Sequence, residues 1–287
     1  MLSDIEVKHQ VREFYDQVGW QEASDGFYQN ASYEDLRSVA HDYIHNCHMR
    51  VLRHLNPSGV LLLDAGSGPI QYPEYLEYSK GFHHRVCADI SVVALQEARK
   101  RVGVHGFFIV CDVANLPFTS NTFDGMVSLH TIHHLPPDEH IRAYQELYRT
   151  LAPAGKGVIV NGWDNPPLTV FLNIWIALAD RLYTLLRPRS KVAGHSEALS
   201  SSENQTANRG TYIRKHNASW LQKEVGSLMP LKIWCWRSIS VRFLRTFIHE
   251  HYAGIWLLKI LYWIEEHFPL FLGKYGQYPL IELSKYK

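Results

Sequence analysis

Short apolar runs alternate with stretches of helical periodicity through the middle of this chain. The apolar runs are Val60–Asp64, Arg85–Ile90, Phe107–Cys111, Phe123–Leu129 and Gly157–Asn161. Runs of this length are expected for strands that are buried on both faces of a sheet. Because strands that alternate with helices favour right-handed crossovers, the pattern predicts an α/β fold around a doubly wound parallel sheet.

Polar residues at two junctions between these elements can begin helices. Ser91 is expected to cap a helix that runs to Arg101, and Asp138 is expected to cap a helix that runs to Leu151. Pro153 would end the second helix before the next strand begins. Both helices then lie between predicted strands, as crossover connections require.

The regions around this alternation divide the chain into four predicted parts. They are an N-terminal helical cap (1–56), the core (57–163), a helical and loop insertion (164–215) and a C-terminal part (216–287). The insertion begins with an apolar helix shorter than the roughly 20 residues of a membrane span, and its polar stretch 191–210 predicts a mobile loop. The C-terminal part has two predicted strands, Leu231–Trp236 and Tyr278–Ser284, around an aromatic-rich helical insertion at 237–277.

Charge and cysteine content narrow the class of protein. The chain has 29 Lys and Arg against 28 Asp and Glu, a formal net charge of +1. Because phosphate neutralisation drives nucleic-acid binding, this balance predicts no nucleic-acid partner. The four cysteines form no C-x-x-C pair, which predicts reduced thiols, no metal site and a cytoplasmic location.

A glycine turn follows the first predicted strand, which ends at Asp64. Gly66 and Gly68 in this turn would let the backbone approach a ligand and leave helix N–H groups free to bind it. The dinucleotide fingerprint needs a third glycine where this chain has Gln71. A nicotinamide-dependent oxidoreductase is therefore a disfavoured alternative. S-adenosylmethionine carries no pyrophosphate and does not require the complete phosphate cradle.

Acidic residues follow the next two strands. Asp89 can accept hydrogen bonds from both hydroxyls of a ribose, as an acid about 20 residues past the glycine turn does in dinucleotide sites. Asp112 can accept one from an adenine amino group, and the segment 116–118 (Leu-Pro-Phe) can close an apolar wall on the ring. The carboxyl ends of parallel strands share one edge of a sheet, so Asp64, Asp89 and Asp112 are predicted to converge around one ligand.

Several stretches together resemble a known family: LLLDAGSGP, CADIS, CDVANLPF, FDGMVSLHTIHHL and ELYRTLAPAGKGVIV. Residues 60–163 are similar to class I S-adenosylmethionine-dependent methyltransferases, close to the ubiquinone and menaquinone biosynthesis group. The resemblance implies a Rossmann-like, seven-stranded sheet with an antiparallel last strand, helical insertions that form a lid, and a core (57–163) that binds S-adenosylmethionine. The cofactor-binding residues that it implies are Tyr15, Asp64, Ala65, Gly66, Gly68, Asp89, Ile90, Asp112, Val113, Leu129 and His130.

The implied reaction is an in-line displacement of a methyl group from a sulfonium, for which a protein mainly supplies positioning. His133 and His134 follow the fourth strand and are candidate catalytic bases, although histidines in such a loop also serve packing. The cluster 265–267 (Glu-Glu-His) is interpreted as a solvated helix face.

The aromatic residues beyond position 163 give the only hint of the methyl acceptor. They favour a small, lipophilic or prenylated acceptor, methylated on carbon or oxygen, and shallow contact with a membrane surface. A non-catalytic scaffold that binds S-adenosylmethionine is the remaining alternative, and the oligomeric state is left open.

Overall fold

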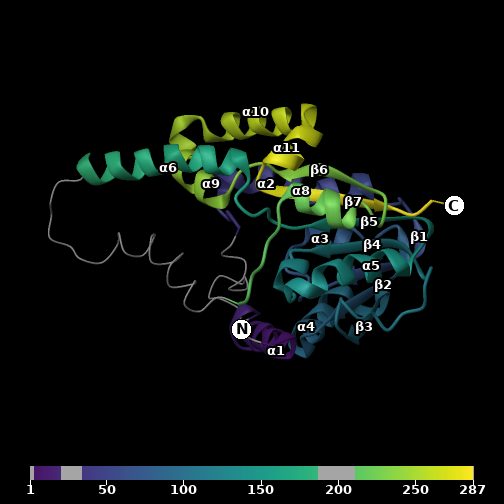
Figure 1. The fold of residues 1–287 in the computed structure, drawn as a ribbon. Coiled ribbons are helices and arrows are strands. Elements are labelled where there is room, and N and C mark those ends of the chain that lie inside the picture. Colours follow the sequence, from purple (N-terminus) through teal and green to yellow (C-terminus); the bar gives the residue numbers. More distant parts are fainter. Residues whose placement is uncertain (1–2, 21–33, 187–210, 287) are drawn as a thin grey trace.

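One seven-stranded sheet forms the centre of the computed structural model, which describes residues 3–20, 34–186 and 211–286 (Figure 1). The strands are β1 (Gly59–Ala65), β2 (Phe82–Asp89), β3 (Gly106–Val110), β4 (Phe123–Leu129), β5 (Leu151–Val160), β6 (Leu231–Arg237) and β7 (Tyr278–Ser284). Their order across the sheet is β3-β2-β1-β4-β5-β7-β6. Strands β1 to β5 pair in parallel, whereas β7 is antiparallel to both β5 and β6. The predicted fold is therefore confirmed.

Helices flank this sheet. They are α1 (Asp4–Phe14), α2 (His41–Met49), α3 (Glu74–Glu77), α4 (Val92–Val102), α5 (His140–Thr150), α6 (Pro167–Leu186), α8 (Ala218–Trp220), α9 (Val241–Phe247), α10 (Gly254–His267) and α11 (Pro269–Tyr275). A π-helical turn, Tyr15–Gly19, extends α1. As predicted, Ser91 caps α4, because its side chain accepts a hydrogen bond from the backbone N–H of Ala94.

The start of β5 differs from the sequence prediction. Asp138 lies in a short 3₁₀ turn ahead of α5 and does not cap that helix. The strand begins at Leu151, directly after the helix, so Pro153 lies inside β5. Pairing with β4 shifts register between Phe123 and Gly125, and this irregularity accommodates the proline. The predicted mobile loop at 191–210 lies outside the described residues.

The two faces of the sheet carry separate apolar cores. Leu63, Met126 and Ile159 lie in one cluster, and their neighbours Leu62 and Val127 lie in the other. Successive side chains of a strand point to opposite faces of the sheet. Adjacent residues, such as Leu62 and Leu63 or Met126 and Val127, are therefore buried in different clusters. This double burial explains the continuous apolar runs of β1, β4 and β5.

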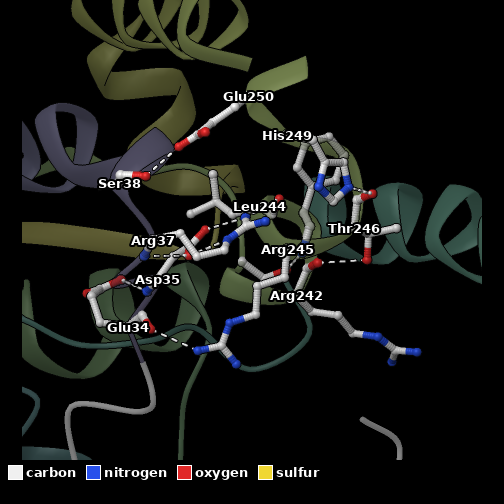
Figure 2. A network of polar contacts seen from close by, with 12 residues as sticks. Glu34, Asp35, Arg37, Ser38, Arg242, Leu244, Arg245, Thr246, His249 and Glu250 are labelled. Atoms are coloured by element: carbon white, nitrogen blue, oxygen red, sulfur yellow. Dashed lines mark hydrogen bonds and ion pairs between the residues drawn. The ribbon is translucent and has the colours of Figure 1, made fainter. Parts of the chain in front are cut away.

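The residues that precede α2 are bound to the C-terminal helical insertion. Arg37 forms an ion pair with Asp35 and donates to the carbonyl oxygen of Leu244 at 2.9 Å, while Arg245 donates to the carbonyl oxygen of Glu34 at 2.9 Å (Figure 2). Helix α9 is thereby fixed to the segment that carries Glu34.

A buried ion pair fastens α10 to α2. Glu265 is 1% exposed and accepts hydrogen bonds from Arg50 and Tyr43, each at 2.9 Å, and from the backbone N–H of Ser238. The interpretation of residues 265–267 as a solvated helix face is therefore wrong at Glu265. A carboxylate can be buried when charged and polar partners satisfy it, and two of these partners, Arg50 and Tyr43, lie more than 200 residues away in sequence.

Candidate active site

A cavity of about 680 Å³ lies at the carboxyl ends of β1, β2 and β4, a volume typical of small-molecule sites. All of the predicted site residues line it except Ala65, which is buried within β1. The lining residues among the predictions are Tyr15, Asp64, Gly66, Gly68, Asp89, Ile90, Asp112, Val113, Leu129, His130, His133 and His134. The structure brings them together, while their individual roles stay predictions.

The glycine turn is held in a backbone conformation that suits glycine. Gly66 has φ +72°, and a Cβ added there would lie 2.2 Å from the side chain of Thr131. Gly68 has φ +55°, and its Cβ would lie 3.1 Å from the indole of Trp20. The turn therefore combines left-handed backbone with close approach of neighbouring side chains, and both conditions favour glycine.

Asp89 closes the same corner from the end of β2. Its Oδ2 accepts a hydrogen bond from the N–H of Gly68 at 2.9 Å, and its Oδ1 accepts one from the N–H of Ser91 at 2.8 Å. Burial raises the pKa of Asp89 to about 6, although these two backbone hydrogen bonds oppose the shift. Further hydroxyl donors, such as those of a ribose, would stabilise the ionised carboxylate.

Asp64 is ion-paired inside the fold with Arg85, which is likewise buried. Arg85 directs Nε (3.0 Å) and Nη2 to the same carboxylate oxygen, Oδ2. Sequence reasoning missed this arginine. Oδ1 of Asp64 has no hydrogen-bond partner within the described part of the chain and belongs to a residue that lines the cavity. Asp64 can therefore bind an ammonium group without losing its internal partner.

Helix α1 is fastened to the third predicted acid. Nζ of Lys8 lies 2.6 Å from Oδ2 of Asp112 and 2.6 Å from Oε2 of Glu139. Burial alone would raise the pKa of Asp112, but hydrogen bonds from Lys8, Ala114 and Asn115 outweigh it and lower the pKa. No local pattern in the sequence indicates this bridge, because its partners are more than 100 positions apart.

An aromatic cluster from the N-terminal segment covers the glycine turn. Tyr15 stacks on Trp20 with ring centroids 4.9 Å apart, and its hydroxyl lies 2.8 Å from Nε2 of His134. Nδ1 of His134 lies 2.9 Å from the carbonyl oxygen of Tyr212 and must donate to it, so Nε2 accepts from Tyr15. Both nitrogens of His134 are thus engaged, and its contacts favour a positioning role over the predicted catalytic one.

The other two histidines of this loop are neutral. Burial lowers the pKa of His130 to about 3 and holds the pKa of His133 well below its usual value. Nδ1 of His133 donates to Oδ1 of Asn161 at 3.2 Å, which leaves Nε2 as an acceptor. His133 is therefore better placed than His134 to accept a proton.

The wall formed by β4, β6 and β7 contains residues that sequence reasoning did not select. The ring of His130 lies 5.9 Å from that of Tyr278, and Arg237 places its guanidinium 4.5 Å from the centre of the same tyrosine ring. Arg237 is ion-paired with Glu34. Burial would raise the pKa of Glu34, but Arg237 and His48 lower it to about 2. This wall is thus aromatic, with its buried charges paired.

Comparison with known proteins identifies the class. A family profile described as "Methyltransferase domain" matches residues 63–159. The probable tRNA methyltransferase 9B of Mus musculus is 37% identical over 102 residues, which are 35% of this chain and 21% of that protein. Its namesake from Bos taurus is 32% identical over 145 residues, or 50% and 29% of the two chains. The matched region therefore spans less than a third of these curated relatives.

Solved structures share the fold at low sequence identity. Phosphoethanolamine N-methyltransferase 2 of Haemonchus contortus, in complex with S-adenosyl-L-methionine, has a TM-score of 0.53 at 15% identity, covering 96% of this chain and 60% of that one. Geranyl diphosphate C-methyltransferase of Streptomyces coelicolor A3(2), in complex with S-adenosyl-L-homocysteine, has a TM-score of 0.54 at 14% identity, covering 97% and 98%.

The sheet topology, the cavity and the domain match define one class. Residues 63–159 of this chain match a methyltransferase domain, and the sheet around them has the fold of class I S-adenosylmethionine-dependent methyltransferases. S-adenosyl-L-methionine is the ligand of the Haemonchus contortus structure that shares this fold, and the domain match leaves the nicotinamide alternative without support. The finer resemblance to the ubiquinone and menaquinone group stays a prediction.

The prediction that excludes a nucleic-acid partner is wrong. It rested on the balanced charge of the whole chain, whereas the curated relatives from three mammals are named probable tRNA methyltransferases. Net charge averages over the entire surface and does not report a local contact with a phosphate backbone.

The polar groups of the cavity fit the cofactor. Asp89 presents a buried carboxylate with a raised pKa, which suits hydroxyl donors. Oδ1 of Asp64 suits an ammonium group, and the left-handed glycines leave room for close backbone approach. Asp112, Val113 and Ile90 lie where the carboxyl ends of neighbouring strands would receive a nucleoside.

Proposed function

We propose that this protein transfers a methyl group from S-adenosylmethionine to a small lipophilic acceptor, on carbon or oxygen. The observation that carries the proposal is the continuity of the cavity. It extends from the acids Asp89 and Asp112 to a wall that includes Tyr72, His130 and Tyr278. Rings of this kind offer an apolar surface with few polar contacts, as lipophilic ligands require.

The residues of the chain would bind and orient the two reactants. Asp89 and Asp112 would hold the nucleoside, and Asp64 the amino group of the methionine. When bound, S-adenosylmethionine supplies a methyl group that its sulfonium already activates. The neutral rings of His130 and His133 add no positive charge beside that sulfonium, since burial keeps the pKa of each below its usual value.

Positioning would supply most of the rate enhancement. An acceptor hydroxyl against His133 could pass its proton to Nε2, because Nδ1 already donates to Asn161. The low pKa makes this imidazole a weak base. Tyr15, stacked on Trp20 above the glycine turn, would help to exclude water.

A nucleic acid is the second candidate acceptor. It is favoured by the curated relatives, which are named probable tRNA methyltransferases and share up to half of this chain. The methyltransferase domain match covers residues 63–159, whereas Arg237 and Tyr278 of the acceptor wall lie outside that match.

The test is a transfer assay with methyl-labelled S-adenosylmethionine, using a total lipid extract and total RNA from the same cells as acceptors. We expect label in the lipid fraction, and none with Asp89→Ala. Asp138→Ala is the matched control, because Asp138 is exposed and does not line the cavity. Label in RNA alone would establish the second candidate. A protein that binds S-adenosylhomocysteine but labels neither fraction would favour the scaffold alternative.

A further inference from the structure

Helix α6 exposes an apolar stripe, which the exposed Arg181 interrupts near one edge. Its large apolar side chains range from 48% exposed at Leu178 to 82% at Leu185. At about 100° per residue, the stripe covers about 140° of the helix circumference. Its residues are Val170, Phe171, Ile174, Trp175, Leu178, Leu182 and Leu185. A surface of this kind is uncommon on a soluble domain unless something covers it.

The remaining circumference of α6 is not apolar throughout. Leu172 packs against the cluster formed by α2, α9 and α10, and Ile176 is buried. Exposed polar residues, Asn173, Asp180 and Thr184, follow on the next side of the helix. The helix therefore has one side on the protein, one in water and one that is apolar and uncovered.

This three-sided pattern distinguishes a helix that spans a lipid bilayer from a helix that lies on its surface. Within the described residues, Pro167–Leu185 is one helix long and apolar enough to cross a membrane, with a mean hydropathy of 1.3. A lipid-exposed span would be apolar around its circumference. A helix with a polar side and an apolar stripe lies in the plane of the interface.

Helix α10 exposes a second apolar surface. Ile255, Trp256, Ile260 and Trp263 are all exposed, whereas Leu258 and Glu265 hold the opposite face against the protein. Leu261 packs against the same apolar cluster as Leu172 of α6. Figure 1 shows both helices on the side of the sheet away from α1, with α6 extending beyond the sheet.

The residue types of this surface match a lipid interface. Trp175, Trp256 and Trp263 are large rings with a polar N–H, the kind that is enriched at membrane–water boundaries. Lys259 lies 5.3 Å from the ring of Trp256, where its stem can lie along apolar groups while the ammonium reaches water. Asp180 would repel anionic headgroups, but its charge is paired with Arg242 at 3.0 Å.

We propose that α6 and α10 dock this protein on the surface of a lipid bilayer, with α6 in the plane of the interface. A convex helix that projects from the fold has no groove of its own to fill, and lipid can surround it from its exposed side. Helix α9 connects α6 with the cavity. Arg242 of α9 binds Asp180 of α6, and Arg245 of α9 binds the backbone of Glu34, whose side chain lines the cavity.

Vesicle co-sedimentation tests this proposal directly. The probes are vesicles of phosphatidylcholine alone and of phosphatidylcholine mixed equally with phosphatidylglycerol. We expect the full chain to bind, and Ile174→Ser/Leu178→Ser to weaken binding by roughly tenfold or more, because two exposed apolar side chains lose their lipid contact. The matched control is Val104→Ser/Val110→Ser, which removes two exposed aliphatic residues at the far edge of the sheet.

Three outcomes of sedimentation and light scattering would overturn the proposal. They are no sedimentation of the wild-type chain, equal loss in both double variants, or a dimer in light scattering that only the α6 variant dissolves. An alkaline carbonate wash should release the bound protein, and retention after the wash would show a span instead. Unchanged thermal stabilisation of the α6 variant by S-adenosylhomocysteine keeps this test separate from the proposed methyl transfer.

Discussion

The backbone N–H of Gly68 donates a 2.9 Å hydrogen bond to Oδ2 of Asp89, which joins the turn after β1 to the end of β2. The contact links the two sequence features that the adenosyl cofactor needs most, a backbone that can be approached closely and an acid that can accept ribose hydroxyls. One substitution at Asp89 therefore disturbs both features.

Asp89→Ala should abolish cofactor binding. A ligand at about 100 times its Kd stabilises a protein by roughly 2.7 kcal/mol, which corresponds to a rise in Tm on the order of 5–10 °C for a chain near this size. We expect that rise for the wild-type chain with S-adenosylhomocysteine, and none for the variant. A full shift in Asp89→Ala would remove the ribose role from this residue.

The affinity for S-adenosylhomocysteine should fall as the pH drops below about 6. Burial raises the pKa of Asp89 to about 6, above the value of 3.8 for an unperturbed carboxyl. In the free protein this group contributes stability that is present below pH 3.8 and lost as the pH rises through about 6. Ribose hydroxyls favour the carboxylate, so binding must displace its proton at low pH. Calorimetric titrations at several pH values measure the effect, and Asp89→Asn should remove this dependence.

Gly66→Ala should destabilise the protein more than Gly103→Ala. Both glycines have positive φ, +72° and +62°, so both substitutions carry backbone strain. Only at Gly66 would the new Cβ meet a neighbour, the side chain of Thr131 at 2.2 Å, whereas nothing lies within 4 Å at Gly103. Urea unfolding of both variants measures the loss in free energy of unfolding, and we expect the larger loss for Gly66→Ala. Equal losses would show that Thr131 can move aside freely.

Much of the cofactor site is predictable because it follows from local pattern. Buried strands are continuous apolar runs, and parallel topology places Asp64, Asp89 and Asp112 at one edge whatever lies between them. The partners of these acids are not local. Arg85 and Lys8 reach these acids through tertiary packing, which no spacing in the sequence encodes.

The same limit explains the error at Glu265. A glutamate followed by another glutamate on a helix suggests a solvated face, but Arg50, in the 3₁₀ turn that follows α2, pairs with the buried Glu265. The start of β5 differs from the prediction for another reason, since an irregularity in its pairing with β4 tolerates a proline that usually marks a loop.

Lys8→Met should destabilise the docking of α1 by about 2 kcal/mol, because it leaves two largely buried carboxylates without their shared cation. The side chains of Lys8 and Glu139 are only 19% and 8% exposed. Urea unfolding and the rate of proteolysis within α1 report the loss. Lys100→Met is the matched control, since Lys100 pairs with Glu97 on the surface at 2.5 Å and should contribute under 1 kcal/mol. Equal effects of the two substitutions would contradict a special role for the Lys8 bridge.

Tyr15 and His134 should act as one unit. The tyrosine hydroxyl donates to Nε2 of His134 at 2.8 Å, and burial lowers the pKa of His134 to about 4, so the imidazole stays a neutral acceptor above that pH. Tyr15→Phe and His134→Ala should each weaken S-adenosylhomocysteine binding by roughly fivefold, the equivalent of about 1 kcal/mol for one hydrogen bond. The double variant should lose little more than either single variant, because the bond is lost only once. Calorimetric Kd values for the wild-type chain, the two single variants and the double variant form a double-mutant cycle. Additive losses of binding free energy would mean that the two side chains hold the cofactor independently.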